Sequence, residues 1–144
     1  ILIVGQAPGI RVHETGIPWN DPSGDRLREW MGLDRQAFYD ETRIAIMPMG
    51  LCYPGRSPHG GDLPPRPECA TKWADAVPAL LPEIEFIVLA GNYAQRRYLA
   101  DMAKASLTET VKCWREYLPR YIPLPHPSFR NNRWIKQHPG SQTK

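Results

Sequence analysis

The sequence has few cysteines, no long apolar run and no phosphate-binding glycine loop. Three cysteines in 144 residues give no disulfide framework, so we expect a reducing, cytoplasmic compartment. No apolar run approaches the roughly 20 residues that span a bilayer, and no signal-peptide pattern opens the sequence, so we expect no membrane partner. The Gly-Lys-Ser/Thr of a Walker loop is missing, and the glycines do not have the spacing of a dinucleotide-binding fingerprint.

Acidic residues are nearly missing from the last third of the chain. Residues 111–144 hold one acid, Glu116, and seven basic residues, a charge of +6; the whole chain carries +3, so the other residues sum to −3. The basic residues are Lys112, Arg115, Arg120, Arg130, Arg133, Lys136 and Lys144. This asymmetry suits a polyanion partner on one face, although a solvated basic tail has the same composition.

The apolar residues fall into four short runs rich in Ile, Val and Leu. These predicted strands are Ile1–Val4, Arg43–Pro48, Glu85–Ala90 and Tyr121–Leu124. Because the runs do not alternate with polar residues, they predict a parallel sheet covered on both faces. The length is that of one domain, residues 1–144, and the abrupt apolar start and patternless polar end lead us to expect truncation at both ends.

Helical spacing lies between these strands. The expected helices are Asp25–Met31, Glu68–Leu81, Asn92–Met102 and Thr108–Tyr117. Ser23 is the expected N-cap of the first, and Pro78 should kink or shorten the second. The order of elements predicts an α/β fold, a three-layer α/β/α sandwich around a mainly parallel four-stranded sheet.

Ligands in such folds bind beyond the carboxyl ends of the strands, which selects the loops that begin at Gly5, Met49, Gly91 and His126. The first loop reads Gly5-Gln6-Ala7-Pro8-Gly9. Its glycines allow a tight turn whose backbone N–H groups face a ligand, although Gly–Pro turns of purely structural character are common after strands.

The last strand ends in His126-Pro127-Ser128. A histidine there can donate a hydrogen bond to charge that develops on a substrate, or can be a satisfied structural residue. Aromatic, guanidinium and amide side chains follow, and such groups stack on bases and hold phosphates. They are Phe129, Arg130, Asn131, Asn132, Arg133 and Trp134.

Trp19 lies between two prolines in Gly16-Ile17-Pro18-Trp19-Asn20-Asp21-Pro22-Ser23-Gly24. It can offer a flat wall to a planar heterocycle, or fill the edge of the sheet as a core residue. Together with the Gly5 loop and His126-Pro127-Ser128, this segment resembles the uracil-DNA glycosylase superfamily. The chain looks most similar to the iron–sulfur, family 4-like enzymes, whose motifs read Gly-Glu-Ala-Pro-Gly and His-Pro-Ser/Ala, and the likeness covers nearly the whole chain.

The resemblance implies a role for each matching residue. The catalytic candidates are His126, which would hydrogen-bond the base carbonyl, and Gln6. The base pocket would comprise Gly5, Ala7, Pro8, Gly9, Trp19 and Pro48. The DNA-binding loop would comprise Ser128, Phe129, Arg130, Asn131 and Arg133. An enzyme that acts on a base within a duplex must extrude it, stack it and read its edge, which fits these groups.

Three positions depart from the family pattern. Ala7 stands where other branches have a water-activating Asp, which the family 4 class also lacks, so catalysis would depend on stabilising the leaving group and on the substrate's own phosphates. Gln6 replaces a Glu. Pro48 replaces the base-reading Asn, and proline has neither an amide side chain nor a backbone N–H. The identity of the excised base is therefore open.

Cys52 and Cys69 match two of the four cysteines that hold the family's four-iron four-sulfur cluster. The other two would lie upstream of Ile1, and two thiols alone cannot hold such a cluster. Taken by themselves, Cys52 and Cys69 are more often buried thiols than metal ligands, and a zinc site with His59 would have unsuitable spacing. Cys113 matches no motif and is expected in the core.

The leading hypothesis is a monomeric, monofunctional DNA glycosylase that removes a deaminated base, foremost uracil, and leaves an abasic site. Pro48 and Gln6 favour a rival, a non-catalytic nucleic-acid-binding member of the same fold, whereas Trp19 and His126 favour the enzyme. A small-molecule nucleoside or nucleotide hydrolase is a third hypothesis. The basic C-terminal segment speaks against it, because a free nucleoside needs no duplex clamp.

Overall fold

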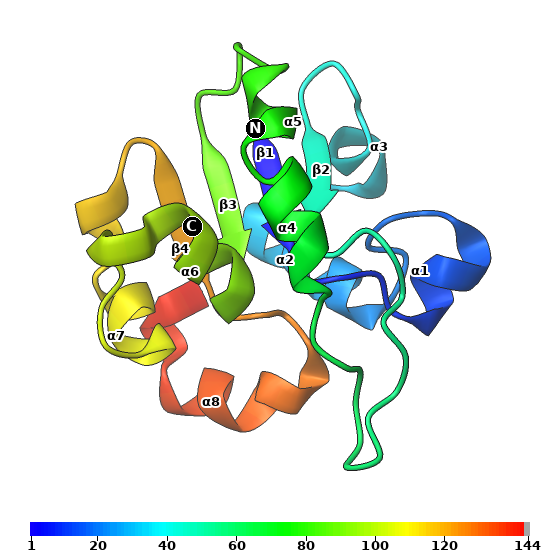
Figure 1. Cartoon of the computed structure of the whole chain (residues 1–144). Coiled ribbons are helices and arrows are strands. Elements are labelled where there is room, and N and C mark those ends of the chain that lie inside the picture. Colours follow the sequence, from blue (N-terminus) through cyan, green and yellow to red (C-terminus); the bar gives the residue numbers. More distant parts are fainter. Residues whose placement is uncertain (143–144) are drawn as a thin grey trace.

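The computed structural model describes residues 1–142 and shows a sheet of four parallel strands (Figure 1). The strands are β1 (Leu2–Gly5), β2 (Ala45–Pro48), β3 (Ile87–Ala90) and β4 (Tyr121–Leu124), in the order β2-β1-β3-β4. All four lie where the apolar runs predict them, and the first three begin one or two residues later than expected. Lys144 of the basic segment lies outside the described residues.

Eight α-helices and four 3-10 turns lie between or after the strands in the described residues. They are α1 (Ile10–Thr15), α2 (Pro22–Met31), α3 (Arg35–Phe38), α4 (Pro67–Trp73), α5 (Ala76–Ala79), α6 (Asn92–Leu99), η1 (Ala100–Met102), α7 (Leu107–Lys112), η2 (Trp114–Tyr117), η3 (Phe129–Asn131), α8 (Asn132–Gln137) and η4 (Pro139–Gln142). No sequence pattern predicts α1, α3 and α8, because they are short and carry little of the apolar periodicity that identifies a helix. Within residues 1–142, no helix has the length and apolar character needed to cross a bilayer.

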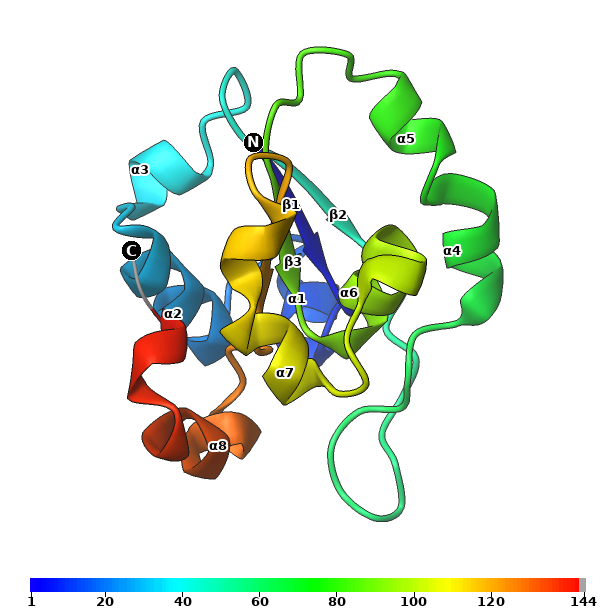
Figure 2. The same cartoon turned by 90° about the vertical axis from the view of Figure 1, so that its left-hand side faces the viewer.

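Two hydrophobic cores cover the two faces of the sheet. Leu2 and Val4 of β1 point into one core with residues of α4, α6 and η2, while Ile3 points into the other with Leu27 of α2 and Phe38 of α3. This alternation follows from the two-residue period of a strand. Figure 2 shows α2 and α3 on one side of the sheet and α4 to α6 on the other. The three-layer α/β/α sandwich is confirmed.

One helical prediction needs correction, and the interruption expected near Pro78 is present. Ser23 lies inside α2, and the N-cap is Asp21, whose carboxylate accepts a hydrogen bond from the backbone N–H of Gly24 at 2.8 Å. The expected helix 68–81 is divided into α4 and α5, and the break falls before Pro78. A proline ring clashes with the carbonyl four residues earlier, here that of Ala74, so the helix ends one turn ahead of the proline.

Candidate active site

The carboxyl ends of β1 and β2 and the loop that follows β4 line a cavity of about 560 Å³. Every residue expected in a base pocket lines it, together with both catalytic candidates: Gly5, Gln6, Ala7, Pro8, Gly9, Trp19, Pro48 and His126. The expectation that the Gly91 loop would also line it is wrong. Gly91 lies behind His126, where a Cβ atom would come within 3.3 Å of the histidine Cβ. That position therefore supports the site from outside the cavity.

Trp19 belongs to the core and to the cavity at once. Its side chain is packed with Ile3 and Leu27, with only 9% of the residue exposed, yet it also lines the cavity. The ring lies directly over the end of β1, where a Cβ at Gly5 would come within 2.7 Å of it. Glycine at position 5 is therefore required for the ring to take this place. Both interpretations of Trp19 from the sequence describe part of its environment.

The backbone at Trp19 is held in the left-handed region, with φ at 59°, which is uncommon for a residue other than glycine. The buried guanidinium of Arg28 stabilises it by donating to the Trp19 carbonyl at 3.1 Å, and a second nitrogen contacts Asp25 at 2.7 Å. The Tyr39 hydroxyl donates to the carbonyl of Pro18 at 2.6 Å. A Cβ at Gly24 would overlap the Trp19 carbonyl. We call residues 17–24 the Trp19 wall.

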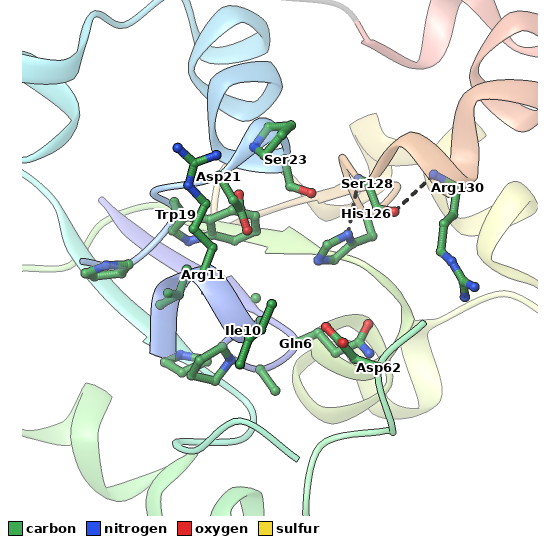
Figure 3. A pocket seen from close by; sticks show the side chains of 18 of the residues that line it. Gln6, Ile10, Arg11, Trp19, Asp21, Ser23, Asp62, His126, Ser128 and Arg130 are labelled. Atoms are coloured by element: carbon green, nitrogen blue, oxygen red, sulfur yellow. Dashed lines mark hydrogen bonds between the residues drawn. The ribbon is translucent and has the colours of Figure 1, made fainter. Parts of the chain in front are cut away.

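His126 lies next to Trp19, with ring centroids 5.8 Å apart and an angle of 30° between the planes. The backbone N–H of Ser128 donates to its Nδ1 at 3.3 Å. An Nδ1 that accepts carries no proton, so the neutral ring has its proton on Nε2; this assignment follows from the hydrogen-bond geometry. Figure 3 shows the edge of the ring away from Ser128 facing the cavity. His126 therefore presents a hydrogen-bond donor to a ligand.

The surroundings of His126 keep it neutral and fixed. Burial lowers its pKa below the ordinary value, and the carboxylates of Asp21 and Asp62 oppose this shift without reversing it. The Asn131 side chain donates to the His126 carbonyl at 2.8 Å, and Arg26 donates to the carbonyl of Pro127 at 3.4 Å. Asn131 and Ser128, expected to contact DNA, thus also hold the histidine in place.

A hairpin of residues 55–63 forms the opposite side of the cavity, and we call it the hairpin wall. Backbone hydrogen bonds close it, from Leu63 to the Gly55 carbonyl at 2.8 Å and from Ser57 to the Gly61 carbonyl at 2.7 Å. Asp62 and Leu63 line the cavity from this side. The Arg130 guanidinium lies against Gly61, whose φ of 78° and lack of Cβ allow the approach.

Four of the five residues expected to bind DNA line the cavity: Ser128, Phe129, Arg130 and Asn131. Phe129 is 69% exposed. Arg133 is exposed on α8 and does not line the cavity.

The sequence did not identify Asp21, Asp62 and Arg11, which also line the cavity. The only sequence signals for the two acids were the cap pattern Asp21-Pro22-Ser23-Gly24 and the Pro- and Gly-rich segment around Asp62.

Cys52 is exposed, Cys69 is half-buried in α4, and both are free thiols. Cys52 lines a second hollow of about 370 Å³ that shares Pro8 and Pro48 with the main cavity. Among residues 1–142, no three His, Cys, Asp or Glu side chains form a group that could hold a metal. Two thiols are half of a cubane's ligands, so the residues present do not by themselves fit the cluster.

A comparison with known protein families agrees with this arrangement. The family model of the uracil DNA glycosylase superfamily matches residues 1–143. The match extends over all four strands and all the cavity residues named above. The match identifies the superfamily and does not distinguish the iron–sulfur subgroup that the motifs lead us to expect. The chain belongs to the uracil-DNA glycosylase superfamily.

Proposed function

We propose that the protein is a monofunctional DNA glycosylase that hydrolyses the N-glycosidic bond of a flipped, deaminated base, foremost uracil, and leaves an abasic site. One observation carries the proposal: His126 presents its Nε2 proton to a cavity walled by Trp19 at the carboxyl edge of the sheet. A planar ring and a fixed donor at one site are what excision of a flipped base requires.

In the proposed reaction, the extruded base stacks on the Trp19 wall. When the bond between the sugar's anomeric carbon and the base nitrogen breaks, its electron pair stays on the base and positive charge develops on the sugar. Negative charge spreads to the base carbonyl, to which His126 donates its Nε2–H. Water adds to the anomeric carbon and releases a proton, and the free base takes up a proton. Ala7 offers no carboxylate to this water, so stabilisation of the leaving base is the main contribution.

The residues after His126 would hold the DNA. Phe129 is largely exposed at the rim of the cavity, where its ring can fill the gap that an extruded base leaves in the stack. Arg130 lines the same rim and Arg133 is exposed on the following helix, so both can contact phosphates. A duplex bound on this side would place the cavity beneath the extruded base.

A non-catalytic DNA-binding role is the second candidate, and Pro48 favours it. Pro48 lines the cavity at the end of β2 and offers no amide to a base edge. Such a protein would bind lesion-containing DNA without releasing a base. Measuring release and binding on the same oligonucleotides therefore separates the two candidates.

The test is a panel of fluorescent oligonucleotides, each with one uracil, hypoxanthine, xanthine or undamaged base, incubated with the full-length protein and cleaved with alkali. We expect strand cleavage at uracil and none at undamaged bases. The His126→Ala variant should lose cleavage, whereas His59→Ala, a change at an exposed histidine outside the cavity, should not. Tight lesion binding without cleavage by the wild type would support the second candidate instead.

The cluster, the cytoplasmic location and the monomeric state stay predictions. A four-iron four-sulfur cluster would need two further thiols in addition to Cys52 and Cys69. Iron and sulfide assays on anaerobically purified full-length protein would test it. If Cys52→Ser and Cys69→Ser leave the iron content unchanged, the two residues are not ligands.

A further inference from the structure

The cavity needs a group that distinguishes one base from another, and Pro48 cannot be that group. Base edges differ in their pattern of hydrogen-bond donors and acceptors, so reading an edge requires polar side chains that face it. His126 supplies one donor on the sheet side. The remaining polar groups must come from the loops opposite.

Asp62 is well placed for this task. It lies on the hairpin wall, where an antiparallel bridge pairs it with Arg56 and the Leu63–Gly55 hydrogen bond follows it directly. Its side chain reaches back to the first loop, because Oδ2 would lie 3.5 Å from a Cβ at Gly9. Its charge acts on His126 across the cavity. Within residues 1–142 no hydrogen bond engages the Asp62 carboxylate, so both oxygens can accept from a ligand.

Gln6 completes the arrangement from the end of β1. Gln6 and Asp62 line the same cavity as His126, and Figure 3 shows all three side chains around this space. No hydrogen bond joins the Gln6 side chain to another described residue either. The cavity therefore presents a donor from His126, an acceptor from Asp62 and an amide from Gln6 that can donate.

We propose that Asp62 is the specificity-determining residue of this site and accepts a hydrogen bond from the ring N–H of the target base, while His126 and Gln6, which line the same cavity, donate to its carbonyl oxygens. This inference rests on the proposed glycosylase function. Two donors and one acceptor are the groups that complement the O2, N3–H and O4 edge of uracil. Cytosine has an unprotonated, accepting N3, which the Asp62 carboxylate repels. The site thus separates uracil from cytosine without an asparagine at position 48.

The test compares excision of uracil and of 3-methyluracil, which lacks the N3 proton, from otherwise identical oligonucleotides. The wild type should excise uracil at least about 100-fold faster, because a polar site left unpaired rejects an analogue that lacks the matching proton. Asp62→Ala should slow uracil excision about 10- to 100-fold and bring the two rates close together. Asp62→Asn, whose amide oxygen still accepts, should retain more uracil excision than Asp62→Ala.

Arg56→Ala on the same hairpin is the matched control, and it should keep the wild-type preference. Asp62 is exposed, so its substitution should leave the unfolding temperature nearly unchanged and the protein folded. A wild type that excises both bases equally, or an Asp62→Ala variant that keeps the full preference for uracil, overturns the role of Asp62 alone. A wild type that binds all these oligonucleotides and excises nothing instead removes the glycosylase function on which the role rests.

Discussion

The two walls of the cavity are built in opposite ways. The Trp19 wall is part of the core: Trp19 packs against β1, and the buried Arg28 and the hydroxyl of Tyr39 hold the backbone beside it. The hairpin wall is largely exposed and depends on its own backbone hydrogen bonds and on contact with Arg130. We therefore expect a displacement of the first wall to disturb the fold more than a change in the second.

This difference corresponds to two tasks. Stacking needs a flat surface that stays in place and suits every base, because all bases have a π-face. Selection between bases needs polar side chains that can be exchanged for others without destabilising the hydrophobic core. Placing Asp62 on the hairpin and Trp19 in the core separates these requirements. The comparison predicts that stability and base preference respond to different substitutions.

The largest effect should come from His126, which stacks beside Trp19 and lines the cavity between the two walls. His126→Ala should lower the single-turnover excision rate at least about 100-fold, roughly 3 kcal/mol, the usual cost of losing one anion-stabilising donor. Binding to abasic-site DNA should change little, because the hydrogen bond that is removed goes to the base. Quenched-flow rates with enzyme in excess would measure this. A variant within about threefold of the wild type would contradict the role.

The next effect tests the Trp19 wall itself. Arg28→Met should lower the free energy of unfolding by about 2 kcal/mol, because the buried carbonyl of Trp19 loses its donor and the methionine replaces only the apolar part of the side chain. Arg56→Met on the exposed hairpin should stay within about 0.5 kcal/mol of the wild type. Urea unfolding of both variants gives the comparison. Equal losses would show that the two walls contribute alike.

The part of the site that lies in short motifs at strand ends can be predicted from the sequence. Gly5 and His126 directly follow apolar strands, and parallel strands bring such positions to one edge of a sheet. Trp19 is identified because it stands in a segment with the family's spacing. These positions follow from the succession of neighbouring residues along the chain, which can be read directly from the sequence.

The missed residues depend on contacts that no local pattern records. Arg28 lies on an amphipathic helix, where a charged residue is expected in solvent, and only the fold shows that it is buried against Trp19. Asp62 lies far beyond the end of β2, and its place depends on how the hairpin folds back. Pro78 is a smaller example. The sequence predicts that this proline interrupts the helix, but the interruption begins at Ala74, one turn before the proline, because the proline ring clashes with the carbonyl of that residue.

A further effect concerns Arg130, whose guanidinium lies against the hairpin wall. Binding should weaken with salt because basic residues displace counterions from phosphates. Changing Arg130 and Arg133 together to Ala should reduce the log–log salt slope by up to about 2, roughly 0.9 for each phosphate that is no longer neutralised. Fluorescence anisotropy across a salt series would measure it. An unchanged slope would show that DNA docks on another face.

The smallest effect is a pH dependence of stability that comes from His126. Burial lowers the pKa of its imidazole in the folded protein, so the unfolded chain takes up this proton first as the pH falls. Stability should therefore decrease as the pH drops below the unfolded pKa of about 6.5, and the loss from this residue should stop below the folded pKa. The total loss equals about 1.4 kcal/mol for each unit by which the two pKa values differ.

The matched comparison for this effect is His126→Gln, which keeps a polar side chain of similar reach and does not titrate. The difference in unfolding free energy between the wild type and this variant should fall as the pH is lowered from 7 and then level off. Asp40 and Glu116 have lowered pKa values through hydrogen bonds to Thr42 and Lys104, and they change stability at more acidic pH. Both carboxylates are present in both proteins, so their contributions cancel in the difference.

A difference that stays constant from pH 7 to 4 would mean that His126 has the same pKa in the folded and unfolded states. A difference that rises on acidification would mean that Asp21 and Asp62 outweigh burial, and His126 would then face the base as a cation.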